Sequence, residues 1–184
     1  FEEVKRYNDL IFISPSNINP RFSNNIISIG VSLDSQLITL INFLKSQKKS
    51  KTIIMYPKNK YQKLVEDKLQ TLKLEGMKKF TYSPNPEVLT GEIETLTNYN
   101  QRKRNLELRK KMFQDKEDEQ SVKELERLEQ LYTLGGVNFD SVIIIDFGNN
   151  LKSVLTSLVY TDVSQTDVLF TTINQWFDES IFYE

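Results

Sequence analysis

Small polar and aromatic side chains stand at the ends of the predicted strands, and they are the residues best suited to recognise a ligand. In an open parallel sheet, ligands bind beyond the carboxyl ends of the strands. A few placed hydrogen-bonding groups and aromatic walls at that edge are typical of a pocket for a small solute. The residues that we predict there are Ser14, Ser16, Asn17, Tyr56, Tyr61 and Asp146.

Several kinds of catalytic and metal site are excluded by residue type. The chain has 0 His and 0 Cys, so it holds no Cys/His zinc site, no Ser-His-Asp triad, no thiol nucleophile and no disulfide. Neither GxxxxGK[ST] nor GxGxxG occurs, and no EF-hand spacing is present. We therefore expect no metal and no cofactor.

The carboxylates are not arranged as an acid/base pair. Asp140 and Asp146 bracket one predicted strand, which places them at opposite ends where they cannot share a substrate bond. A hydrolase built on Asp146 with Tyr56 is the best enzymatic alternative, but no pair of a base and an orienting group supports it. We expect a protein that is not an enzyme.

Charge and length narrow the class of protein further. The 184 residues include 24 Lys+Arg and 25 Asp+Glu, a net charge of -1, which argues against nucleic-acid binding. The longest apolar runs fall far short of the roughly 20 residues that span a bilayer. A chain of this length buries roughly 70 % of its unfolded surface, enough for a good core. Because the chain opens with Phe1, we expect a fragment or a processed form of a globular protein.

Apolar periodicity predicts alternating strands and helices. The predicted strands are 10–13, 26–31, 51–56, 77–82, 139–146 and 168–173, and the predicted helices are 33–46, 59–74 and 151–160. Ser32 or Asp34 is expected to cap the first helix, and Gly76 to end the second. The continuous apolar run within 139–146 is typical of a central strand buried on both faces. This order predicts an α/β fold with a parallel sheet built from βα units.

Residues 92–134 interrupt the alternation with a strongly charged segment. Between Gln101 and Gln130 there are nine Lys/Arg and eight Asp/Glu, with sparse but ordered apolar positions. The pattern predicts an amphipathic helix or helical pair, too charged to lie inside a core. It is either a solvated helical insertion or a docking surface for a partner, and in the second case Arg102, Arg104 and Arg109 are the candidate contact residues.

Two longer stretches resemble the type I periplasmic-binding-protein fold. They are "IFISPSN" followed by "IISIGVSLDSQLITLINFLKSQKKSKTIIMYPKNKYQKLVEDKLQ", and the closing run "FDSVIIIDFGNNLKSVLTSLVYTDVSQTDVLFTTINQW". The segments "TLTNYNQRKRNLELRKKM" and "YTDV" are most similar to the C-terminal domain of penicillin-binding-protein activator lipoproteins. The resemblance implies that 1–24 ends a first lobe and crosses over, that 25–176 forms the second α/β lobe with a helical insertion at 92–134, and that 177–184 begins a return segment.

The resemblance also implies a role. Proteins of this kind are non-catalytic and periplasmic, are lipid-anchored through a segment upstream, and regulate a peptidoglycan synthase. The alternative, which resembles branched-chain amino-acid receptors, is a substrate-binding receptor for an ABC transporter of amino acids. In receptors an aromatic residue followed by glycine is common after the strand, whereas this chain has Tyr61-Gln62, so its amino-acid clamp differs.

Overall fold

The computed structural model describes residues 6–7, 9–14, 25–74 and 76–173. Its centre is a four-stranded parallel sheet in the order β4-β3-β5-β6. The strands are β3 (Thr52–Pro57), β4 (Lys78–Tyr82), β5 (Ser141–Ile144) and β6 (Leu169–Thr172). The expected α/β class with a parallel sheet is confirmed.

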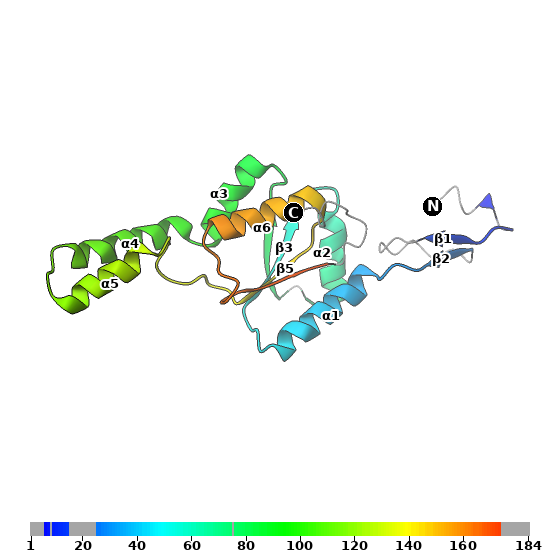
Figure 1. Ribbon diagram of the computed structural model, residues 1–184. Helices are drawn as coiled ribbons and strands as arrows, with labels where there is room; N and C mark the ends of the chain where they lie inside the picture. Colours follow the sequence, from blue (N-terminus) through cyan, green and yellow to red (C-terminus); the bar gives the residue numbers. More distant parts are fainter. Residues whose placement is uncertain (1–5, 8, 15–24, 75, 174–184) are drawn as a thin grey trace.

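Helices cover both faces of this sheet, as a parallel sheet requires (Figure 1). One face packs against α1 (Leu33–Ser46) and α2 (Gln62–Thr71), and the other against α3 (Pro86–Leu96) and α6 (Gly148–Tyr160). Each face of the sheet has its own hydrophobic core. Alternate residues of β3 belong to one core or the other, because successive side chains of a strand point to opposite faces. Ile53 and Met55 join the α3–α6 core, whereas Ile54 and Tyr56 join the α1–α2 core.

The strands of the central sheet and the helices predicted beside them are present, but one predicted helix cap is wrong. Helix α1 spans the predicted 33–46, and the Ser32 hydroxyl caps it by accepting a hydrogen bond from the Ser35 amide. Helix α2 ends at Thr71 with Leu72 as its C-cap, and Lys73 follows in the left-handed conformation (φ 55°), so Gly76 does not end the helix. Glycine is usual at such a position, but a lysine occupies it here at the cost of some backbone strain.

Two further strands pair with each other rather than with the central sheet. β1 (Phe12–Ser14) and β2 (Ile26–Ser28) form a separate two-stranded parallel sheet, which lies beyond α2 and the start of α1 in Figure 1. The run 26–31 was expected in the second lobe, and its strand β2 pairs with β1 and not with the central sheet.

The charged segment forms a helical hairpin, α4 (Tyr99–Gln114) and α5 (Glu119–Glu129), which projects from the body of the molecule (Figure 1). The predicted start at residue 92 falls inside α3, which packs on α6 in the core; the hairpin itself follows Asn98, whose φ of 51° turns the chain between α3 and α4. The prediction of a helical pair is confirmed.

Arg102 ties the base of this hairpin to the α/β unit. Its guanidinium donates hydrogen bonds to the carbonyl oxygens of Gly135 (2.7 Å), Thr161 (3.0 Å) and Asp162 (2.8 Å). The side chain is buried, and burial lowers the pKa of Arg102 against the opposing effect of the Asp162 carboxylate. Arg102 therefore links α4 to the turns that follow α5 and α6.

We predict that Arg102→Met lowers the free energy of unfolding by about 3 kcal/mol, because the buried Thr161 carbonyl and the partly buried Gly135 and Asp162 carbonyls lose their donor, and a buried carbonyl left unsatisfied costs roughly 1–3 kcal/mol. Urea denaturation followed by circular dichroism measures this. The matched control is Arg104→Met, two residues along α4 and exposed, which should change stability by less than about 0.5 kcal/mol. Equal losses in the two variants would contradict the role assigned to Arg102.

Candidate functional site

The carboxyl ends of three central strands meet at one edge of the sheet. Pro57 of β3 is in register with Tyr82 of β4, and the Ile145 amide after β5 donates to the carbonyl of Met55 (2.8 Å). Asp146 follows directly. The helices that begin beyond this edge, α2, α3 and α6, supply the remaining side chains around it.

A buried pair of Tyr82 and Asp146 lies at the centre of this edge. The Tyr82 hydroxyl donates to Asp146 Oδ2 (2.6 Å), and the Phe147 amide donates to Oδ1 (2.9 Å). The two side chains belong to residues that are 0 % and 2 % exposed. Burial raises the pKa of the Asp146 carboxyl, and hydrogen bonds from Tyr82, Phe147 and Asn150 only partly oppose it. Burial and the neighbouring carboxylate also raise the pKa of Tyr82, so this phenol keeps its proton and remains a donor.

Two aromatic rings lie beside this pair. Tyr61 precedes α2 and Phe147 precedes α6, and their rings meet edge to face with centroids 6.2 Å apart. The Phe147 ring remains 56 % exposed, and the ammonium of Lys60 lies 5.1 Å from the centroid of the Tyr61 ring. The Tyr61 and Phe147 rings present an apolar surface to whatever approaches the edge.

Gly148 directly follows Phe147 and turns the chain into α6. Its φ is 57°, a conformation that glycine adopts without strain.

An ion pair completes the edge on the side of β4. Lys58 Nζ lies 2.7 Å from Glu92 Oε1, and the Ser83 amide donates to Glu92 Oε2 (2.6 Å). Burial would raise the pKa of Glu92, but the hydrogen bonds from Lys58 and Ser83 outweigh it and the pKa is lowered. The edge thus offers a fixed negative charge beside a half-exposed ammonium group.

The structure brings only some of the predicted ligand residues together here. Asp146 and Tyr61 lie at this edge. Tyr56 is 1 % exposed in the α1–α2 core, where its hydroxyl lies 3.4 Å from Glu66 Oε1, so it does not line an open rim. Ser14 belongs to β1 in the other sheet. Ser16 and Asn17 lie outside the described residues.

The three predicted partner residues differ in role. Arg102 is a buried structural link and is not available to a partner, which corrects the expectation for this residue. Arg104 is exposed on α4. Arg109 is exposed, but its guanidinium carbon lies 4.8 Å from the centroid of the Phe113 ring, and its charge acts on Glu124 of α5.

The sequence analysis missed three residues that build this edge, namely Tyr82, Lys58 and Glu92. Tyr82 was detectable in principle, since it closes a predicted strand. Lys58 and Glu92 carried no such signal, because their pairing depends on how α3 packs beside β3 and β4.

The carboxyl of Asp146 is enclosed by its own donors, and among the described residues no group of three or more Asp or Glu is placed to hold a metal ion. No helix within the described ranges is long and apolar enough to cross a membrane. No family model, curated protein or solved structure matches the chain.

We predict that the pH dependence of stability separates Asp146 from Asp140. Because burial raises the pKa of Asp146, the folded state binds more protons than the unfolded state, so its contribution is present at low pH and is lost as pH rises through the folded pKa. In urea titrations, Asp146→Asn should therefore gain stability relative to the original protein as the pH rises above about 4, the ordinary pKa of an aspartate.

Asp140→Asn is the control with the opposite sign. Burial would raise the pKa of Asp140, but hydrogen bonds from the Ser50 and Lys51 amides outweigh it and the pKa is lowered. The stability of the original protein relative to Asp140→Asn should therefore be fully present above the unfolded value of about 4 and should be lost as the pH falls below it through the folded pKa. Parallel pH profiles for the two variants would refute the environments described for these carboxyls.

Proposed function

We propose that this chain is the second lobe of a two-lobed, non-catalytic binding protein of the type I periplasmic-binding-protein fold. In this proposal the protein acts in the periplasm as a regulator that resembles the activators of peptidoglycan synthases. The carboxyl edge of the central sheet forms one wall of a cleft, and the α4–α5 hairpin docks the partner.

Two lobes are supported by the exposed apolar surface of the β1–β2 pair. Ile13 and Ile27 are cross-strand partners and are 65 % and 51 % exposed, while Ile11 and Ile29 beside them are 73 % and 67 % exposed. Parallel sheets are stable when both faces are covered, and a two-stranded sheet is marginal alone. A larger sheet with its own helices would cover these residues, and this is the place of a first lobe in the fold.

Docking through α4–α5 rests on one observation, the exposed stripe on α4. Arg104, Leu108 and Met112 follow one another at four-residue spacing, which places them on one side of the helix. Leu108 is 61 % exposed and Met112 is 58 % exposed, and Lys111 is exposed beside them. We call these four residues the α4 stripe. Two apolar side chains flanked by cations suit a partner surface with an apolar centre and an acidic rim.

The charge of the hairpin is divided between its helices. Helix α4 carries six Lys/Arg and one Glu, whereas α5 carries four Glu against Lys123 and Arg127. The net positive charge of the hairpin therefore lies on α4 and its net negative charge on α5. Such a field steers association with an acidic partner and fixes its orientation.

The receptor alternative is supported by the aromatic pair at the carboxyl edge. Tyr61 and Phe147 with the Lys58–Glu92 pair provide an apolar wall next to both signs of charge, a combination that suits the side chain, amine and carboxylate of an amino acid. In that case lobe closure around the solute is the signal, and the hairpin is a solvated insertion.

We predict that Arg104→Glu combined with Lys111→Glu weakens binding to a purified peptidoglycan synthase of the source organism by about tenfold, mainly through slower association. Biolayer interferometry at two salt concentrations measures this. Lys63→Glu combined with Lys79→Glu, the same charge change at exposed positions on α2 and β4, serves as the control and should leave binding unchanged.

Two results would count against docking by the hairpin. No binding of the synthase to the original protein would remove this partner, and equal weakening by the control variant would show a non-specific charge effect. The receptor alternative would instead be supported if calorimetry detected binding of an amino acid. That binding should be lost in Phe147→Ala and kept in Arg104→Glu combined with Lys111→Glu.

A further inference from the structure

A cavity of about 690 Å³ opens at the amino edge of the central sheet, opposite the candidate site. It lies between the end of α1, the start of β3 and the start of β4, with Asn138 from the segment before β5. Its volume falls within the roughly 300–1,000 Å³ of pockets that hold small molecules. The cavity is separate from the carboxyl edge, so it needs an explanation of its own.

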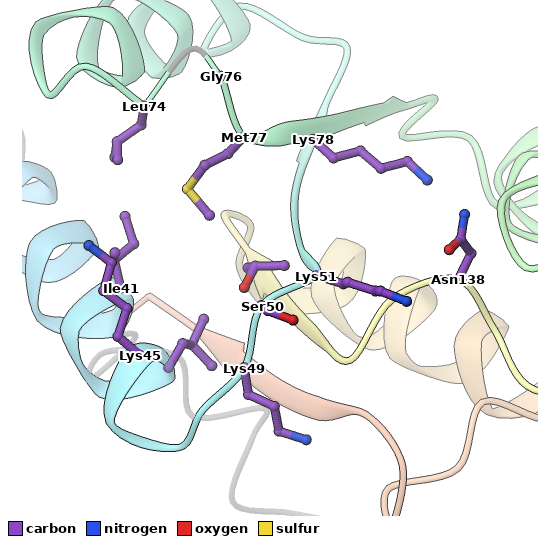
Figure 2. A pocket seen from close by; sticks show the side chains of 12 residues that line it. Ile41, Lys45, Lys49, Ser50, Lys51, Leu74, Gly76, Met77, Lys78 and Asn138 are labelled. Carbon is purple, nitrogen blue, oxygen red and sulfur yellow. The ribbon is translucent and has the colours of Figure 1, made fainter.

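One wall of this cavity is apolar. Ile41 and Leu44 of α1 are 7 % and 2 % exposed, and Leu74 and Met77 approach them from the segment between α2 and β4. Figure 2 shows Leu74, Met77 and Ile41 on one side of the hollow, with the thioether of Met77 directed into it. Methionine adapts its shape to an apolar group more readily than branched side chains do.

The other wall is cationic. Lys51 precedes β3 and Lys78 opens β4, and Figure 2 shows both extending on the side where Asn138 lies, away from the apolar wall. Lys45 and Lys49 add two more ammonium groups to the lining. Four lysines along one hollow make it electropositive, which favours a ligand that carries a negatively charged group.

The carboxylate of Asp140, beside the start of β3, is bound by donors of the protein itself. Asp140 accepts hydrogen bonds from the Ser50 amide (2.8 Å) and the Lys51 amide (3.0 Å) and from the Ser141 hydroxyl (3.0 Å). These bonds hold the backbone at the start of β3 and therefore the position from which the Lys51 side chain leaves. Asp140 is not part of the lining, although the charge of Lys49 acts on it.

We propose that this cavity binds an amphiphilic organic anion, a carboxylate or phosphate monoester that carries an alkyl or aryl group. The anionic group lies between Lys51 and Lys78 within reach of the Asn138 amide. The apolar group lies against Met77, Leu74 and Ile41. The proposal is independent of the function proposed for the carboxyl edge, because the two sites share no residue.

Isothermal titration calorimetry with octanoate and octyl phosphate tests this on the full 184-residue chain. The original protein should bind at least one of them, and inorganic phosphate and octyltrimethylammonium at least tenfold more weakly, since each lacks one half of the ligand. Lys51→Glu combined with Lys78→Glu should weaken binding at least tenfold. Lys103→Glu combined with Lys111→Glu on α4 is the matched control and should leave the dissociation constant unchanged.

A second variant separates the apolar wall from the charges. Met77→Asp should weaken octanoate and octyl phosphate binding at least tenfold, while Ile27→Asp, on the exposed apolar face of β2, should not change it. The proposal is overturned if neither anion binds, if the ammonium compound binds equally well, or if either control variant loses binding as much as the cavity variant does. Unchanged thermal unfolding of Lys51→Glu/Lys78→Glu confirms that lost binding is not lost folding.

Discussion

Burial of β3 and β5 on both faces is the constraint on which the rest of the structure depends. All four residues of β5 are buried, and so are five of the six in β3, so helices must cover both sides of the sheet. Parallel pairing then brings the carboxyl ends of the strands to one edge and their amino ends to the other. The polar residues that follow the strands form the candidate site at the carboxyl edge. The residues that precede β3, β4 and β5 line the cavity at the amino edge.

The same constraint explains how a charged hairpin is tolerated between β4 and β5. Helix α3 covers the sheet together with α6, and only then does the chain leave the body as α4 and α5. Arg102 holds the base of this excursion through three carbonyl oxygens. A rigid base with exposed residues further along the hairpin is an arrangement suited to presenting a surface, whereas a freely moving hairpin would lose conformational entropy on every encounter.

Much of the fold could be predicted from the sequence because burial and periodicity are local signals. The run 139–146 showed a doubly buried strand, and the spacing in 33–46 gave the limits of α1. The partner of β2 could not be predicted, since Ile26–Ser28 carries the same apolar signal whether it pairs with β1 or with the central sheet. Site residues were harder to predict, as Tyr56 shows. A tyrosine at the end of a strand was expected to line the ligand site, but the alternation of side chains along β3 directs Tyr56 into the α1–α2 core. Arg102 was misjudged for a related reason, because a charged helix gives no sign of which cation lies at its base.

The central proposal is that a first lobe, which the chain enters through β1 and β2, covers these two strands. Amide hydrogen exchange of the protein isolated from its source tests this most directly, because covered strands exchange slowly and an isolated two-stranded sheet does not. In a two-lobed protein, the amides of β1 and β2 should be protected as strongly as those of the edge strands β4 and β6. Exchange in β1 and β2 as fast as in the exposed residues 164–167 would contradict the two-lobed protein.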